Sequence, residues 1–271
     1  MRGMAPEDLY ELTWVSDPRL SPDGGTVSVT VWRIDREAGE YRSSIWLVPA
    51  DGSGPPRQFT SGPKLDLEAR WSPDGSLLAF ASNREGGPRQ LYVMPVAGGE
   101  PRRLTDLKAD VKQMDIRWSP DGERIAFVAR VPAPEYEEED EKKRRPRRFT
   151  RLQYKLDDVG WTGDRRRHLF VVPADGSAEA TQLTSGDFEH QWPTWSPDGS
   201  RIAFVSNRDD DWDISRDTHI YLVEAAGGEP RRVTDEGSVY EALSWSPDGA
   251  LIACRWAPGG LDYPWHQRIA V

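Results

Sequence analysis

The chain has 271 residues, enough for one large β domain or two small domains. Its net charge of −10 argues against a nucleic-acid partner, because such proteins carry a basic surface. No run approaches the roughly 18 apolar residues of a membrane helix, so we expect no membrane partner. Residues 1–10 lack the apolar core of a signal peptide, and we therefore expect a cytoplasmic location.

The tetrapeptide Ser-Pro-Asp-Gly occurs five times along the chain. Its starts are 51, 47, 77 and 50 residues apart, so one interval carries an insertion of roughly 27 residues. Proline sets φ for a type I turn, Asp fits the next position, and Gly takes the left-handed position after it. Each copy therefore predicts a hairpin turn between two strands. The copies begin at Ser21, Ser72, Ser119, Ser196 and Ser246.

The residue before the turn is tryptophan in four of the five copies, and a short apolar strand follows each turn. A second apolar strand then leads into a glycine turn, and a short polar strand ends the repeat. Four short antiparallel strands per roughly 50 residues predict the blades of a β-propeller, because one such sheet cannot bury both faces alone. A β-sandwich does not predict this tandem repeat, and the Gly-His and Trp-Asp signatures of WD-repeat propellers are missing.

The fold class expected is therefore all-β, a propeller of four-stranded blades with about five blades present. The third blade contains the insertion, residues 131–167. The fifth blade breaks off before its last strand, so we expect a truncated chain with an unfinished ring. Such a ring exposes strand edges and predicts poor solubility. The expected blades span residues 14–60, 66–105, 112–184, 190–234 and 240–271.

The insertion opens with an acidic run, residues 135–141, and continues with a basic run, residues 142–151. One interpretation is a solvated loop at one end of the propeller, since its prolines discourage regular structure. The other is a surface that contacts a substrate or partner. The apolar content of residues 154–161 indicates that the second half is packed. The candidate contact residues are Arg147, Arg148, Arg151, Tyr154 and Trp161.

No serine has glycine at both −2 and +2, so the chain lacks the nucleophile elbow of an α/β-hydrolase and no catalytic residue is assigned. The histidines, at 168, 190, 219 and 266, have no metal-ligand spacing. The acidic cluster at 209–213 lacks the glycine and glutamate of an EF-hand, and a solvated loop is expected there. Cys254 lies in a strand-like run, where a buried small hydrophobe is expected. We expect no metal and no cofactor.

Several segments resemble the bacterial acylaminoacyl-peptidase-type serine peptidases of the prolyl oligopeptidase family. They are residues 6–10 leading into 15–24, residues 41–48, residues 154–170 and residues 204–209, so the resemblance runs along nearly the whole chain. The Ser-Pro-Asp-Gly repeats are less specific, because TolB-like propellers share them.

The resemblance implies an N-terminal propeller that covers the active site of a C-terminal α/β-hydrolase domain and admits short peptides. This chain would supply the propeller and none of the hydrolase, which would be its partner in cis. The isolated chain is then expected to lack peptidase activity. The alternative is a free-standing TolB-like propeller that acts as a protein-binding scaffold, since propellers offer a rigid ring of loops.

Overall fold

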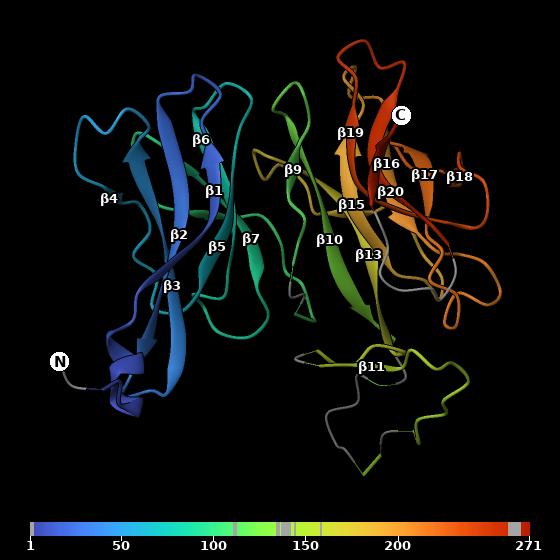
Figure 1. The fold of residues 1–271 in the computed structure, drawn as a ribbon, viewed down its shortest axis with the longest axis horizontal. Coiled ribbons are helices and arrows are strands. Elements are labelled where there is room, and N and C mark those ends of the chain that lie inside the picture. The colour runs from blue at the N-terminus through green and yellow to red at the C-terminus, as the bar shows by residue number, and fades with distance from the viewer. Residues whose placement is uncertain are drawn as a thin grey trace. The chain divides into compact units, whose positions relative to one another are not determined.

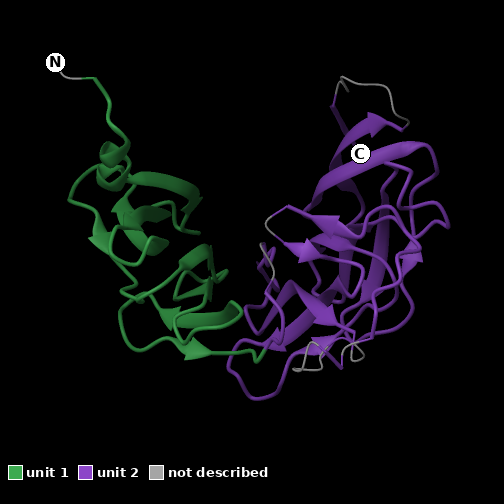
Figure 2. Cartoon of the chain, turned by 90° about the horizontal axis from the view of Figure 1, so that it is seen from below, with its two compact units in different colours: residues 1–106 green, residues 107–271 purple. Residues whose placement is uncertain are grey.

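The fold of the described residues is nearly all-β, built from five antiparallel sheets of three or four strands and one two-stranded sheet (Figure 1). The structure is a computed structural model that describes residues 3–110, 113–133, 136, 142–143, 145–157, 159–259 and 267–271. It divides into two compact units, Met1–Asp106 and Leu107–Val271 (Figure 2). No helix among the described residues is long and apolar enough to cross a membrane.

Unit 1 contains a short 3-10 helix, η1 (Pro6–Glu11), and two sheets. In each sheet the strands lie side by side in chain order, as expected for a blade. The first sheet contains β1 (Trp14–Leu20), β2 (Thr26–Asp35), β3 (Glu40–Pro49) and β4 (Arg57–Gln58). The second contains β5 (Asp66–Trp71), β6 (Leu77–Ser82), β7 (Gln90–Pro95) and β8 (Arg102–Arg103).

Unit 2 contains three sheets and one extra hairpin. The third sheet contains β9 (Arg117–Trp118), β10 (Arg124–Pro132), β13 (Arg165–Pro173) and β14 (Thr181–Gln182). The fourth contains β15 (His190–Trp195), β16 (Arg201–Ser206), β17 (His219–Glu224) and β18 (Arg231–Arg232). The fifth has three strands, β19 (Ser238–Trp245), β20 (Ile252–Pro258) and β21 (Arg268–Ala270). Four sheets thus have the four strands expected, and these blades confirm the propeller class.

Each Ser-Pro-Asp-Gly copy forms the expected turn between the first and second strands of a sheet. In the second sheet, Ser72 Oγ donates to Asp74 at 2.6 Å and accepts the Leu77 N–H at 2.9 Å. The hydrogen bond from Ser72 is the main reason that the pKa of Asp74 falls to about 2. The closing glycine, Gly75, has φ +73°, the left-handed conformation that glycine adopts without strain.

A residue with positive φ lies four positions before the turn serine of every sheet; in four sheets it belongs to the first strand, and in the third it precedes β9. In four sheets a register shift in the pairing with the second strand falls at the same place, which marks a β-bulge. None of the five is glycine, so each sheet holds a strained backbone position. They are Asp17, Glu68, Asp115, Trp192 and Ala242.

The tryptophan before the turn joins neighbouring sheets. Trp71 Nε1 donates to the Arg19 carbonyl of the first sheet at 3.0 Å. In unit 2, Trp195 Nε1 donates to the Arg117 carbonyl at 3.1 Å, and Trp245 Nε1 donates to the Thr194 carbonyl at 3.3 Å. In each case the acceptor lies two positions before the turn serine of the preceding sheet. The repeat therefore encodes the contact between sheets as well as the turn.

Hydrophobic side chains fill the spaces between consecutive sheets of the same unit. Ile45, Leu78 and Phe80 are fully buried between the first and second sheets. Ala126, Leu169, Ile202 and Phe204 are fully buried between the third and fourth. Burial of one such large side chain contributes about 1.5–3 kcal/mol, so these interfaces dominate the stability of each unit.

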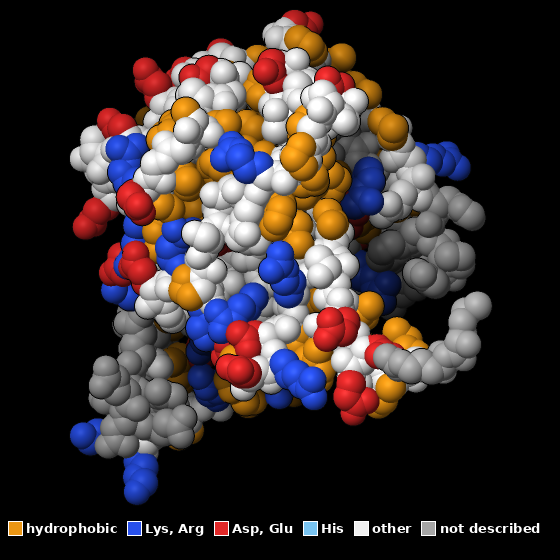
Figure 3. Space-filling model, turned by 90° about the vertical axis from the view of Figure 1, so that its left-hand side faces the viewer, with side chains coloured by type: hydrophobic (Ala, Val, Ile, Leu, Met, Phe, Trp, Pro, Cys, Tyr) orange, Lys and Arg blue, Asp and Glu red, His pale blue; other side chains and the backbone are white. Residues whose placement is uncertain are grey.

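Each unit also exposes large apolar side chains. In the first sheet Val15 and Leu20 are about 60% exposed, and in the fifth Ile269 is 82% exposed. On the face seen in Figure 3, hydrophobic side chains lie among arginine, lysine and carboxylate side chains.

Candidate functional site

The long loop between β10 and β13 carries the candidate site. These two strands pair along their full length, from Arg124 opposite Pro173 to Pro132 opposite Arg165. The loop leaves this ladder at Ala133, whose N–H donates to the Asp164 carbonyl at 2.7 Å. Within it, β11 (Lys155–Leu156) and β12 (Gly160–Trp161) form a small hairpin beyond the end of β10 (Figure 1). A rigid ladder therefore holds the base of the insertion.

Three aromatic rings pack together on this hairpin and the segment before it. The ring centroid of Phe149 lies 4.5 Å from that of Tyr154 and 5.3 Å from that of Trp161. The exposed fractions of the three residues range from 36% to 51%. The second half of the insertion is thus packed on itself while presenting an aromatic surface to solvent. Such a surface suits contact with another molecule.

Arg147 lies against these rings. Its guanidinium sits 5.1 Å from the Trp161 ring centroid and 5.3 Å from that of Tyr136, within the range of a cation–π interaction. Its Nη2 donates to the buried carboxylate of Asp164 at 2.6 Å. Asp164 also accepts from Arg165 Nε at 3.0 Å. Arg147 is therefore held in place from two sides.

Arg151 ties the insertion to the loop between β16 and β17. Its Nη1 lies 3.1 Å from Asp213 Oδ1, and the Leu152 N–H donates to Asp213 Oδ2 at 2.8 Å. These contacts, the Leu152 bond first, lower the pKa of Asp213. The acidic cluster that sequence reasoning placed in a solvated loop thus partly anchors the insertion.

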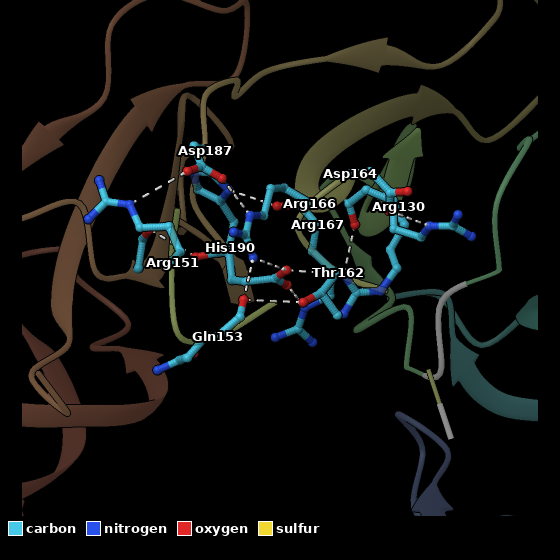
Figure 4. A network of polar contacts seen from close by, with 12 residues as sticks. Arg130, Arg151, Gln153, Thr162, Asp164, Arg166, Arg167, Asp187 and His190 are labelled. Atoms are coloured by element: carbon cyan, nitrogen blue, oxygen red, sulfur yellow. Dashed lines mark hydrogen bonds and ion pairs between the residues drawn. The ribbon is translucent and has the colours of Figure 1, made fainter. Parts of the chain in front are cut away.

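Near the base of the insertion, the carboxylate of Glu189 contacts three arginines. Glu189 accepts from Arg130 Nη1 at 3.0 Å and from Arg167 Nε at 2.9 Å, and Arg166 Nη1 lies 3.8 Å from it. Arg166 Nε donates to Asp187 at 2.7 Å (Figure 4). Burial lowers the pKa of Arg130, although Glu189 partly offsets this effect. Cations outnumber carboxylates in this network.

Two buried histidines adjoin the network. The rings of His168 and His190 lie 5.2 Å apart. His190 Nδ1 donates to the Arg167 carbonyl at 2.8 Å, and its Nε2 accepts from Arg208 Nη2 at 3.1 Å, which is the pattern of a neutral ring. Burial lowers the pKa of His168 to about 4 and that of His190 to about 3. Both rings are therefore uncharged at neutral pH.

All five candidate contact residues line one cavity of about 80 Å³, which we call the arginine pocket. Sequence reasoning missed other residues of its wall, among them Tyr136, Phe149 and Arg166. Phe149 and Arg166 could have been found, because they stand in or beside arginine runs. Asp164 and Asp187 carry no local signal, since only the fold brings them to the pocket. Whether the pocket contacts a substrate stays a prediction.

No group of three or more described His, Cys, Asp or Glu residues could hold a metal ion. Within the acidic loop, Asp209 instead contacts His219 Nε2 at 2.7 Å and Arg232 Nη1 at 3.2 Å. The buried Cys254 has a raised pKa because of burial. His266 lies outside the described residues, as does most of the acidic run at 135–141.

Comparisons with known proteins agree with this architecture. Residues 12–142 match the TolB β-propeller domain, and residues 160–257 match the dipeptidyl peptidase IV N-terminal region. The chain is 34% identical over 225 residues to the peptidase YuxL of Bacillus subtilis, which covers 80% of this chain and 33% of that protein. The chain is a β-propeller that is similar to regions of known peptidases.

Other relatives of the propeller are peptidases as well. It is 28% identical over 271 residues to dipeptidyl-peptidase 5 of Porphyromonas gingivalis, with 92% of this chain and 38% of that protein covered. It superposes on the acylaminoacyl peptidase of Pyrococcus horikoshii with a TM-score of 0.69 at 19% identity, which shows the fold. That match covers 91% of this chain and 36% of the peptidase. The propeller thus spans about a third of the length of these relatives.

Proposed function

We propose that this propeller filters and orients short peptides for a serine-peptidase domain encoded beyond these 271 residues. The observation that carries the proposal is the 34% identity to a peptidase of which the chain covers only 33%. The chain itself has no Gly-x-Ser-x-Gly nucleophile elbow, so the reaction would take place on the other domain.

The arginine pocket is the part of the propeller best suited to hold a peptide. Its guanidinium groups can donate paired hydrogen bonds to carboxylates and single ones to peptide carbonyls. Its aromatic rings offer a flat surface for apolar side chains. Because the β10–β13 ladder fixes the base of the insertion, these groups would be presented with little loss of conformational entropy on binding.

The proposal is tested by comparing two proteins from the same gene, namely this chain and the product of the full reading frame. We expect the chain alone to leave an acyl-alanyl chromogenic substrate intact. The full product should hydrolyse it and should cleave short peptides in preference to a folded protein. Hydrolysis by the isolated chain, or a downstream frame without Gly-x-Ser-x-Gly, would contradict the proposal.

A second candidate function is a free-standing binding scaffold. The match of residues 12–142 to the TolB β-propeller domain favours it. Affinity purification of this chain would then recover one stoichiometric protein partner, and the gene would encode no peptidase domain. Recovery of no such partner would count against the scaffold.

A further inference from the structure

We propose that the arginine pocket recognises a carboxylate group of the bound peptide, so that acidic peptides are the preferred class. This inference rests on the proposed function, because it names the substrate class of the same site. Four observations carry it: the charge of the wall, one arginine and one buried donor that have no partner among the described residues, and the aromatic surface beside them.

The wall of the pocket is cationic although the chain is acidic. It contains four arginines (Arg147, Arg148, Arg151 and Arg166) and two aspartates (Asp164 and Asp187), a surplus of two positive charges. The whole chain carries a net charge of −10. A local surplus of cations in an acidic protein favours an anionic ligand at this place.

The two aspartates are already engaged and leave part of the cationic charge uncompensated. Asp164 binds Arg147 and Arg165, and Asp187 binds Arg166 at 2.7 Å with Arg151 at 3.9 Å. Arg148 is exposed and forms no hydrogen bond or ion pair with any residue that the structure describes. Its side chain is exposed to solvent at the pocket.

Arg147 offers a further donor. Its Nε is buried and has no hydrogen-bond partner among the described residues. A buried donor without a partner costs free energy, and an incoming acceptor would remove that cost. Arg147 and Arg148 are adjacent in the chain and line the same cavity, which at about 80 Å³ suits a carboxylate and the carbons beside it rather than a whole peptide.

The aromatic surface next to these arginines distinguishes a peptide from a small inorganic anion. The exposed fractions of Phe149, Tyr154 and Trp161 beside the cavity range from 36% to 51%. An adjoining apolar side chain of the peptide can pack there while the carboxylate meets the guanidinium groups. A peptide carboxylate comes from an acidic side chain or from the C-terminus, and the two sources need separate probes.

The experiment measures binding of three tetrapeptides to the 271-residue chain by isothermal titration calorimetry at low salt. Acetyl-Ala-Phe-Glu-Ala-amide carries only a side-chain carboxylate. Acetyl-Ala-Phe-Gln-Ala with a free C-terminus carries only a terminal one. Acetyl-Ala-Phe-Gln-Ala-amide carries neither. We expect at least one of the first two to bind more tightly than the third, and the tighter of the two identifies the source.

Arg148→Gln is the decisive variant and Arg145→Gln its matched control, since Arg145 is a nearby exposed arginine outside the pocket wall. We expect Arg148→Gln to weaken binding of the acidic probe about fivefold, the effect of losing one exposed ion pair. Binding of the neutral probe should not change, and Arg145→Gln should have little effect on any probe.

Equal binding of all three probes would overturn the inference, as would equal weakening by the two variants, which would indicate a non-specific charge effect. Neither result would bear on the peptidase activity expected of the full gene product. Conversely, lack of peptidase activity in that product would refute the proposed function while leaving carboxylate recognition by this chain intact.

Discussion

Arg208 Nη2 lies 3.1 Å from Nε2 of the buried His190, at the position where the second sheet has an arginine–aspartate pair. There, Arg84 binds both oxygens of the fully buried Asp66 at 2.9 and 3.0 Å. Asp66 pairs with Ser82 in its sheet, just as His190 pairs with Ser206 in the fourth. The repeat therefore keeps the arginine and replaces its carboxylate by a neutral imidazole.

This replacement predicts acid sensitivity of unit 2. In the unfolded chain His168 and His190 titrate near 6.5, whereas burial lowers their folded pKa values to about 4 and about 3. The unfolded state then binds more protons below pH 6.5, so stability is lost as the pH falls from 6.5 towards 4. At pH 5 each histidine should cost about 2 kcal/mol relative to pH 7.

Urea unfolding of the wild type and of His190→Asn at pH 7 and pH 5 checks this expectation. The variant should lose less stability than the wild type between the two pH values. His219→Asn is the comparison, because this buried histidine contacts a carboxylate, that of Asp209, whereas His190 contacts an arginine. An identical pH dependence in the wild type and His190→Asn would contradict the assignment.

Trp195 should stabilise the junction between the third and fourth sheets through its indole N–H. Trp195→Phe keeps an aromatic ring but leaves the Arg117 carbonyl without this donor, so we expect a loss of about 1–3 kcal/mol. Trp46, half-buried and bonded to Ser44 of its own strand, provides the control. Thermal melts should show a clearly lower midpoint for Trp195→Phe than for Trp46→Phe.

The backbone strain in the first strands predicts opposite effects for two substitutions in the fifth sheet. Ala242 has φ +52°, so Ala242→Gly should relieve strain and be neutral or stabilising by up to about 1 kcal/mol. Gly249 has φ +71°, and Gly249→Ala should destabilise by about 1–2 kcal/mol. Chemical denaturation of both variants tests the pair, and the reverse order of stabilities would refute the strain argument.

A threonine two residues after each fourth strand should contribute to stability through its side-chain hydroxyl. Thr184 Oγ1 accepts the Leu169 N–H at 2.9 Å, and Thr60, Thr105 and Thr234 do the same in their sheets. Thr184→Val leaves a buried N–H without its partner, with an expected cost of about 1–3 kcal/mol. Thr181→Val, at an exposed position of β14 just before Thr184, should be nearly neutral in the same unfolding assay.

Features with a local chemical cause could be predicted from the sequence. Ser, Pro, Asp and Gly each have a distinct role within their own turn, and all five turns form as expected. The 3-10 helix at residues 6–11 was missed, although Pro6 and the Asp8 side chain bonded to the Ala5 N–H are local signals of a helix start.

Features that depend on distant partners could not be predicted. The strained position before each turn is occupied by Asp, Glu, Trp and Ala, so no residue type marks it. In the site, the run of arginines was visible, but Asp187 reaches Arg166 from another connection of the chain. Which arginines of the pocket pair with an aspartate follows from the fold and not from their spacing in the sequence.

The tryptophan contacts between sheets have an evolutionary consequence. At the three described junctions the donor belongs to the later repeat, and the acceptor is a backbone carbonyl of the earlier one. Every residue type has a backbone carbonyl. A duplicated repeat therefore carries the donor side chain for its own junction and requires no matching side chain in its neighbour. Gene duplication could lengthen such an array one repeat at a time, leaving loops such as the insertion free to diverge.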